Sequence, residues 1–293
     1  GQIGDSGLIK SSNNEFKVSD TKKILKVYLH YGKVTKGGFK KKQTVNMQVD
    51  KKKRNSIKIY HSATHLLHAA LRHILGKHVT QKGSLVSFDR FRFDFSYPKS
   101  IDETEVKKIE NIVNKIIKQN NKVLISIMSH KKAVGMGAMA LFGEKYDDEV
   151  RVVTMGKNDN KSNFSMELCG GTHVKNTGDI NDIKIVKQSP VAAGIRRIEA
   201  LCGNDLLNYL NEEKKVLTLK EKEKENKEER KGLDEKKKKS SLSDPSKNII
   251  EEGTHNSIKY YFRTIIEFPP NELPELLDKC KIEIQNGVVA IFS

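Results

Sequence analysis

The chain has 293 residues, of which 36% are apolar and 31% are charged, and its formal net charge is +17. No apolar run approaches the roughly 18 residues that span a bilayer, and no signal peptide is visible, so we expect a protein of the cytoplasm or an organellar matrix with no membrane partner. The positive charge indicates a polyanionic partner, most often nucleic acid, although a lysine-rich surface composition alone would produce the same excess.

The first 58 residues have the pattern of short β-strands. They open with GQIGDSGLIK, which reads like the interior of a domain, so we expect the chain to be a piece of a longer protein. From about residue 16 to 59, apolar and polar residues alternate in runs such as KILKVYLHYG, TVNMQVD and NSIKIY, separated by glycines. This pattern predicts a small antiparallel sheet or a partial β-barrel over residues 1–58.

Residues 59–203 combine helical and strand-like patterns. Apolar spacings of three and four predict a helix over 61–75, and IDETEVKKIENIVNKIIKQN predicts a second, amphipathic helix capped by Asp102. Strand-like alternation occurs in SLVSFDRFRFDFSYP, VLISIM, VRVVTM and IKIVKQ. In the first of these segments three phenylalanines share one face: Phe91, Phe93 and Phe95. A mixed α+β domain is therefore expected.

The composition changes after this domain. Residues 204–247 form a charged segment of low complexity, which predicts a long solvated helix, with disorder as the alternative. Residues 248–293 return to a strand–helix–strand pattern in IKYYFRTIIEF, LPELLDKCKIEI and GVVAIFS. This pattern predicts the start of a further α/β domain that is cut within its last strand.

Two pairs of potential metal ligands lie in the α+β region. His61 and His65 are one helical turn apart in HSATHLLHAAL, and Cys169 and His173 have the same spacing in CGGTH. Side chains at i and i+4 share one helix face, whereas the paired glycines of CGGTH favour a tight loop. Imidazole nitrogens and a thiolate suit zinc, so these four residues predict a site for one Zn²⁺. His68, on nearly the same face, is a substitute ligand or a neighbour of the site.

The spacing leaves the role of the metal open. Four protein ligands are typical of structural zinc, because catalytic zinc keeps one position for water. A catalytic role requires one ligand to yield its place to water or substrate, and we expect Cys169 to be that ligand. Together with Cys202 and Cys280 it makes three cysteines, too few for a disulfide framework, which fits a reducing intracellular setting.

Several segments then carry a family resemblance. HSATHLLHAALRHILGKHVTQKGSLV, GAMALFGEKYDDEVRVVTMG, ELCGGTHVKNTGDI and AAGIRRIEA resemble, block after block, the editing domain of alanyl-tRNA synthetases. GQIGDSG and the strands after it resemble the segment that precedes that domain. The charged segment and GVVAIFS resemble the start of the carboxyl-terminal tRNA-binding and oligomerisation domain. The resemblance covers nearly the whole chain and is densest from 59 to 203.

The resemblance implies a hydrolase that acts on mischarged tRNA. A synthetase pocket for alanine rejects glycine or serine by only about 10–200-fold, so a second, hydrolytic site is needed. The implied substrates are the serine and glycine esters of tRNA(Ala), and the family's zinc ligands correspond to His61, His65, Cys169 and His173. The parent enzyme would attach alanine with ATP in a domain absent from this chain, and would form oligomers through its carboxyl-terminal region.

Further site residues follow from the same resemblance. Thr64 and Gln81 match family positions tied to the editing pocket, where a hydroxyl and an amide would select serine and orient water. Each has a plain alternative, because Thr64 would also serve as a small helix residue and Gln81 as a turn cap. Met136 and Met139 fit core packing better than substrate contact. The candidate tRNA contacts are Arg196, Arg197, Lys82 and Arg92.

Two rival interpretations use the same residues. A free-standing trans-editing deacylase would share the GQ-x-x-D-x-G segment and both ligand pairs, but the strands before residue 59, GAMALFGEKY and the carboxyl-terminal segment favour the synthetase. A zinc-stapled RNA-binding module would have the metal without catalysis. Editing domains of threonyl-tRNA synthetases share the ligand layout, although CGGTH and GIRRIEA favour the alanine system.

Overall fold

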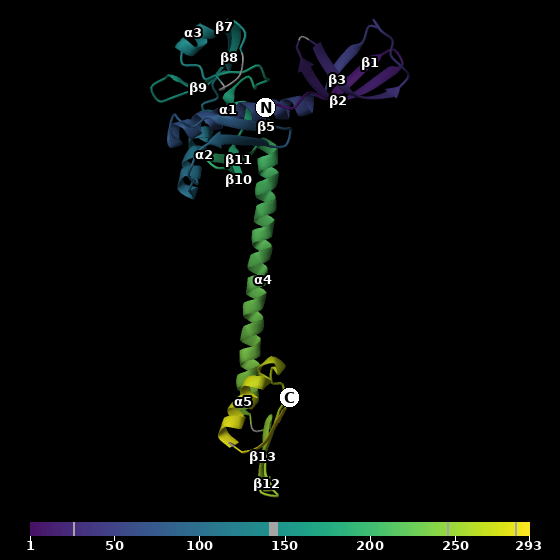
Figure 1. Ribbon diagram of the computed structural model, residues 1–293. Helices are drawn as coiled ribbons and strands as arrows, with labels where there is room; N and C mark the ends of the chain where they lie inside the picture. The colour runs from purple at the N-terminus through teal and green to yellow at the C-terminus, as the bar shows by residue number, and fades with distance from the viewer. Residues whose placement is uncertain (26, 141–145, 245, 285) are drawn as a thin grey trace. The chain divides into compact units, whose positions relative to one another are not determined.

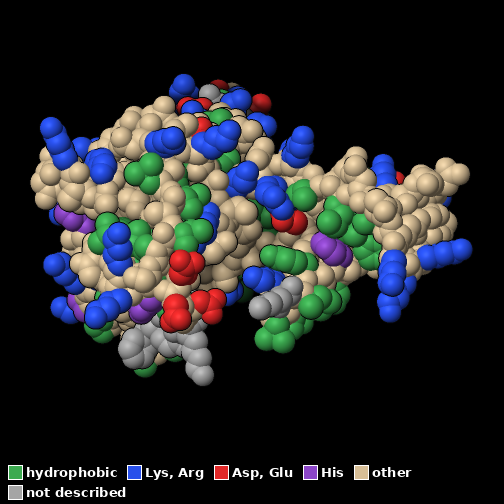
Figure 2. Space-filling view, turned by 90° about the horizontal axis from the view of Figure 1, so that it is seen from above, with side chains coloured by type: hydrophobic (Ala, Val, Ile, Leu, Met, Phe, Trp, Pro, Cys, Tyr) green, Lys and Arg blue, Asp and Glu red, His purple; other side chains and the backbone are tan. Residues whose placement is uncertain are grey.

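A computed structural model of the chain describes residues 1–25, 27–140, 146–244, 246–284 and 286–293, with backbone alone at positions 229, 231, 234, 237, 238, 240 and 241. The chain divides into two compact units, Gly1–Leu210 and Asn211–Ser293 (Figure 1). Helices and mostly antiparallel sheets occur in both units, which confirms the predicted α+β class. On the face in Figure 2, Lys and Arg side chains are spread over much of the surface, and acidic side chains form small groups.

The amino-terminal strands form an open sheet and not the predicted barrel. The antiparallel order is β3-β2-β1-β4, with bounds Gly7–Ser11 for β1, Asn14–Ile24 for β2, Val27–Lys36 for β3 and Asn46–Val49 for β4. Closure of a barrel requires hydrogen bonds between the edge strands. In the part of the chain that the structure describes, β3 pairs with β2 and β4 with β1. The short β4 leads at once into a helix, so the prediction of a barrel is wrong for these strands.

The following helix begins earlier than predicted. Helix α1 spans Lys51–Leu75, so NSIKIY, predicted as a strand, lies within it. Asp50 caps the helix, because its carboxylate accepts a hydrogen bond from the backbone N–H of Lys53. Ile57 and Tyr60 are then buried at a helical spacing of three. Alternation over six residues is compatible with either period, and the cap decides in favour of the helix.

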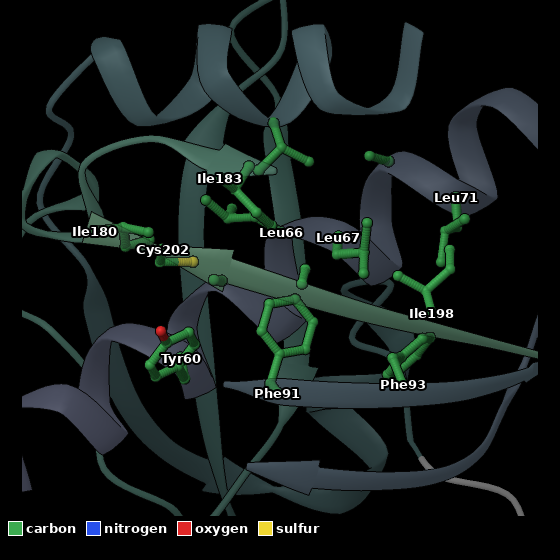
Figure 3. Close-up of a cluster of buried hydrophobic side chains, with 14 of the residues drawn as sticks. Tyr60, Leu66, Leu67, Leu71, Phe91, Phe93, Ile180, Ile183, Ile198 and Cys202 are labelled. Atoms are coloured by element: carbon green, nitrogen blue, oxygen red, sulfur yellow. The ribbon is translucent and has the colours of Figure 1, made fainter. Parts of the chain in front are cut away.

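Helix α1 packs on an antiparallel sheet that forms the main core. The strand order is β10-β11-β6-β5, with bounds Gln81–Val86 for β5, Phe91–Ser96 for β6, Ile183–Ala192 for β10 and Ile195–Cys202 for β11. The three phenylalanines of β6 are completely buried, as their shared face predicts. Figure 3 shows Phe91 and Phe93 in the same cluster as Leu66, Leu67 and Leu71 of α1. Each such side chain contributes about 1.5–3 kcal/mol of burial free energy.

A second helix and a smaller sheet complete this region. Helix α2 (Glu103–Lys118) begins at Asp102 as predicted, and Asp102 and Glu105 form a reciprocal capping box. The sheet β7-β8-β9 comprises Leu124–Ser129, Glu149–Lys157 and Asn163–Leu168, with helix α3 (His130–Gly135) after β7. Helix α1 contacts both this sheet and the main one (Figure 1). Residues 141–145 of the predicted GAMALFGEKY block lie outside the described residues.

The second unit contains most of a long helix and a small α/β fold. Helix α4 spans Gly203–Ser243, so the helical alternative for the charged segment is the one observed. Sheet β12-β13-β14 comprises Asn248–His255, Ile258–Ile265 and Gly287–Phe292, and α5 (Leu273–Ile284) precedes β14. Because β13 and β14 are parallel, the predicted strand–helix–strand unit is confirmed. Among the described helices, none has the length and apolarity to cross a membrane.

Candidate metal centre

The two predicted ligand pairs meet between α1 and the loop after β9. Ligand atoms of His61, His65, Cys169 and His173 all lie within 4.8 Å of one another. Cys169 Sγ is 3.5 Å from His61 Nε2 and 3.3 Å from His173 Nε2. Tetrahedral bonds of about 2.0–2.3 Å to zinc would separate neighbouring ligand atoms by about 3.5 Å. The donor atoms and their spacing therefore fit one zinc ion.

Each of the three histidines has an oxygen close to Nδ1. The contacts are His61 Nδ1 to Gln2 Oε1 at 3.0 Å, His65 Nδ1 to Glu167 Oε2 at 3.0 Å, and His173 Nδ1 to Ser62 Oγ at 3.1 Å. This arrangement leaves Nε2 of each ring for the cluster. Hydrogen bonds at the other ring nitrogen are the usual device that fixes the orientation of metal-binding histidines.

The contacts of Gln2 fix the tautomer of His61. Gln2 Oε1 also accepts hydrogen bonds from the backbone N–H and the hydroxyl of Thr172, at 2.9 and 3.0 Å. A backbone N–H is only a donor, so this atom of Gln2 is the amide oxygen and not the nitrogen. His61 Nδ1 therefore donates its proton to Gln2, and its Nε2 faces the other members of the cluster.

The CGGTH segment is a loop, as predicted, and one of its glycines is required by close packing. A Cβ at Gly171 would lie 2.1 Å from Cε1 of His61, so any other residue would displace that ring. At Gly170, no atom of the described residues, apart from its chain neighbours, comes within 4 Å of the corresponding position. Arg151 donates to the carbonyl oxygens of Cys169 and Gly171 at 2.6 and 2.8 Å. The packing of Gly171 on His61 places the loop against α1, and Arg151 ties it to β8.

The protonation states of two ligands suit metal binding. Burial alone would raise the pKa of the Cys169 thiol, but hydrogen bonds from His173, His61 and His65 lower it to about 3. Burial lowers the pKa of His173 to about 4. At neutral pH, Cys169 is thus a thiolate and His173 is a neutral imidazole, which are the forms that bind zinc.

Glu167 is a buried carboxylate shared by two histidines. Its oxygens lie 3.0 Å from His65 Nδ1 and 3.1 Å from His68 Nδ1. Burial opposes charge on His65, but the Glu167 carboxylate outweighs it and raises the pKa of His65 to about 10. His65 in turn keeps the pKa of Glu167 well below its usual range despite burial. His68 is buried behind the ligands, so it is a neighbour of the cluster and not a surface residue.

Thr64 and Gln81 line the same cavity as the cluster. This cavity, of about 270 Å³, is also lined by His61, His65 and Cys169, and on one side by Met139. The Thr64 hydroxyl is buried and donates to the carbonyl of Tyr60 at 2.8 Å. Gln81 Nε2 donates to Ser84 Oγ at 3.1 Å. Met139 therefore lines the cavity, whereas the sequence favoured a position in the core.

The four candidate tRNA contacts lie on the main sheet and have differing surroundings. Arg197 on β11 donates two hydrogen bonds to Asp94, at 2.7 and 2.8 Å, and Arg92 Nε lies 3.8 Å from the same carboxylate. Lys82 is exposed and Arg196 is half-buried, with no described partner for its buried Nε. The positive charge of Arg197 is thus largely neutralised within the chain.

Sequence reasoning missed the residues that support the ligands. Gln2, Ser62 and Glu167 contact the histidines, and Arg151 holds the loop. Ser62 and Glu167 adjoin the two ligand motifs in sequence, so they could have been considered. Glu167 is two positions before Cys169, and the alternation of a strand would have placed the two side chains on the same side. Gln2 and Arg151 are distant in sequence from the residues they contact, so no local pattern could have found them.

Comparison with known proteins identifies two segments and several relatives. A family model described as "Threonyl and Alanyl tRNA synthetase second additional domain" matches residues 150–199, and one described as "tRNA synthetases class II (A)" matches residues 1–53. Cys169 and His173 lie within the first match, whereas His61 and His65 lie between the two.

The relatives are alanine–tRNA ligases. The one from Haemophilus influenzae (strain PittGG) is 42% identical over 100% of this chain and 35% of its own length. Those from Parvibaculum lavamentivorans and Rickettsia bellii are each 51% identical, over 72% and 74% of this chain and 24% of their own length. The chain therefore spans about a third of the length of the first of these relatives.

Proposed function

Because the chain belongs to the alanine–tRNA ligase family, we propose that its ligand cluster binds one Zn²⁺ and that the adjoining cavity hydrolyses serine and glycine esters of tRNA(Ala). The observation that carries this proposal is that three of the four candidate ligands, His61, His65 and Cys169, line one cavity together with Thr64 and Gln81. The whole ligase would attach alanine to tRNA(Ala) with ATP outside the length spanned here. We also propose a cytoplasmic location and self-association through the carboxyl-terminal region.

Hydrolysis adds water to the ester carbonyl carbon, breaks the bond to the ribose oxygen and delivers a proton to that oxygen. A zinc ion held by His61, His65, Cys169 and His173 would supply a positive charge that stabilises the negative charge developing on oxygen. Gln2, Ser62 and Glu167 keep the three histidine rings in place, and Arg151 keeps the loop in place. Gln81, fixed by Ser84, carries an amide whose oxygen is suited to accept a hydrogen bond from the attacking water.

Thr64 supplies a basis for selecting serine over alanine. Its hydroxyl proton is used by the Tyr60 carbonyl, so its oxygen remains an acceptor for the hydroxyl of a bound serine. An alanine ester would leave this buried oxygen without that partner. Sites built to bind a substrate hydroxyl discriminate against analogues that lack it far more strongly than apolar pockets discriminate by size.

Cys169 is the ligand that we propose to yield its place during catalysis. It is half-buried, whereas His65 and His173 are buried and have oxygen partners at Nδ1. Loss of one of four protein ligands would open the coordination position that catalytic zinc requires.

A zinc-stapled RNA-binding module is the second candidate function. It is favoured by the four protein ligands and by the oxygen partners of all three histidines, because closed, well-supported sites are typical of structural zinc. The two candidates differ in whether the ester is cleaved.

The test is deacylation of Ser-, Gly- and Ala-tRNA(Ala) by the zinc-loaded chain and by Thr64→Val, which keeps the shape and removes the acceptor oxygen. We expect the wild-type chain to cleave the serine and glycine esters and spare alanine. In the variant, the serine rate should fall by about tenfold, the effect of one hydrogen bond, while the glycine rate changes little. A chain that holds zinc and cleaves neither ester would favour the RNA-binding module.

A further inference from the structure

We propose that a trough between α1 and β9, which runs outward from the metal centre, binds the single-stranded nucleotides at the 3′ end of the tRNA. This proposal rests on the proposed function, because it names the surface that receives the rest of the substrate once the ester lies in the cavity at the cluster. It places the strand contacts on α1 and β9 and not on the arginine-bearing main sheet.

The trough is continuous with the metal centre. The cavity at the cluster and a second cavity of about 440 Å³ share Met139 in their linings. The second cavity in turn shares His73, Asn158 and Phe164 with a third of about 410 Å³. The three cavities therefore adjoin one another in a row along α1.

The alternation of β9 gives the trough its floor. Glu167, which contacts His65 and His68 of α1, lines the first cavity, and Ser165, two residues earlier on the same strand face, lines the second. Residues of α1 line the first cavity at His65 and the second at Arg72. Because residues of both α1 and β9 line the two successive cavities, a bound nucleic-acid strand would run along these two elements.

The charge of the second cavity suits phosphate. Arg72, His73 and Lys77 line it, and no carboxylate occurs among the described lining residues. Arg72 is anchored by a hydrogen bond of 2.6 Å from Nη1 to the carbonyl of Val79, so its charge is not compensated by an acid there. Arg197 on the main sheet is the opposite case, because Asp94 takes both of its hydrogen bonds. The second cavity, in the middle of the trough, therefore offers positive charge that is available to a polyanion.

Ser165 is a polar group that is buried in the second cavity without a described partner. Only 3% of its surface is exposed, and its hydroxyl makes no hydrogen bond among the described residues. An unmade hydrogen bond of a buried hydroxyl costs free energy, so such a group indicates a ligand that completes it. Phe164, which lines both outer cavities, adds an aromatic surface of the kind on which bases stack. Basic, hydroxyl and aromatic groups together are typical of single-strand binding.

Two variants test the trough, and a third away from it serves as the control. Ser165→Ala removes only the unpartnered hydroxyl, and Lys77→Glu reverses an exposed charge, while Lys99→Glu makes the same reversal at an exposed position after β6. Thermal unfolding of Ser165→Ala should be unchanged or shifted upward, because no hydrogen bond within the chain is lost. We expect KM for Ser-tRNA(Ala) to rise about three- to tenfold in Ser165→Ala and about tenfold in Lys77→Glu at low salt. KM should change less than twofold in Lys99→Glu.

The substrate is varied in parallel to separate the trough from the chemistry. Seryl-adenosine carries the ester without the preceding nucleotides, so both trough variants should cleave it at the wild-type rate. Binding of uncharged tRNA(Ala) should also weaken in both variants, and the difference from wild type should vanish for tRNA(Ala) trimmed of its single-stranded 3′ end.

The outcomes distinguish the two proposals. If the wild-type chain cleaves neither Ser-tRNA(Ala) nor seryl-adenosine, the proposed function fails, and the binding comparison with intact and trimmed tRNA still decides on the trough. If binding and cleavage are the same in Ser165→Ala, Lys77→Glu and the wild type, or if Lys99→Glu weakens binding to intact tRNA as much as Lys77→Glu does, the trough proposal is overturned.

Discussion

Glu167 on β9 and Asp94 on β6 are both carboxylates with less than a tenth of their surface exposed, and each lies close to nitrogen atoms of other segments. Glu167 lies 3.0 Å from His65 and 3.1 Å from His68, whereas Asp94 accepts two hydrogen bonds from Arg197. The first contact turns the other nitrogen of His65 toward the cluster. The second neutralises an arginine that the sequence offered as a tRNA contact. A buried carboxylate therefore has different consequences in the two places. Glu167 orients a candidate metal ligand, His65, whereas Asp94 neutralises the charge of Arg197, which is then not available to bind phosphate.

The largest expected effect is at His65. His65→Ala removes a predicted metal ligand and the closer partner of buried Glu167, so we expect loss of bound zinc and a decrease of about 3 kcal/mol in the free energy of unfolding. Metal analysis and chemical denaturation measure the two effects. His73→Ala, at an exposed position of the same helix, is the control and should retain both zinc and stability. Retention of zinc by His65→Ala would remove it from the ligand set.

Gln2→Ala should weaken the site without unfolding the chain. It removes the acceptor that fixes the tautomer of His61, and loss of such supporting contacts typically costs 10–100-fold in metal affinity. Competition with a zinc chelator measures the affinity, and the absorption spectrum of the Co²⁺-loaded chain reports the change in coordination. Gln43→Ala, in the amino-terminal sheet region, should leave both unchanged. If Gln2→Ala keeps the wild-type zinc affinity and Co²⁺ spectrum, Gln2 does not orient His61 and serves only to connect the amino terminus to the loop at Thr172.

Zinc binding should release protons in a defined way. At pH 8 the thiol of Cys169 (pKa about 3) and the ring of His173 (about 4) are already deprotonated, whereas His65 (about 10) holds a proton when no metal is present. Zinc must displace that proton, so affinity should rise about tenfold per pH unit as pH increases from 8 to 9. Calorimetry in buffers of different ionisation enthalpy measures the proton count, expected to be about one. A count of zero would show that His65 is already neutral beside Glu167 when no metal is bound.

The smallest functional effect is expected at Arg197. Arg197→Lys loses the two-pronged contact with Asp94 and should lower thermal stability slightly. Because this charge is already compensated, KM for Ser-tRNA(Ala) and the salt dependence of tRNA binding should change less than twofold. If the slope of log affinity for tRNA against log salt concentration decreased by about one, Arg197 would contact a phosphate.

The sequence allowed the cluster of candidate metal ligands to be predicted, because spacing along a helix and within a glycine loop is local information. The alternation of Phe91, Phe93 and Phe95 and the cap at Asp102 were likewise local, and both are confirmed. NSIKIY was misread because six alternating residues fit either period. The prediction of a barrel was wrong because the pattern of a strand does not specify whether the two edge strands of a sheet pair with each other.

The supporting contacts could not be read in the same way. Gln2 reaches His61 across 59 positions and Arg197 reaches Asp94 across 103, so only the folded chain shows which polar groups are already satisfied. For the same reason, net charge predicted a polyanionic partner but not which basic residues remain available to it.

The central claim is that this cluster takes part in ester hydrolysis and does not only hold the fold together. It is tested most directly by single-turnover deacylation of Ser-tRNA(Ala) by the wild-type chain and by Cys169→Ala, with zinc content and secondary structure measured on the same samples. We expect cleavage by the zinc-loaded wild type, sparing of Ala-tRNA(Ala), and a loss of at least about a hundredfold in a folded Cys169→Ala. Equal cleavage of Ser-tRNA(Ala) by a folded, zinc-free Cys169→Ala would contradict it.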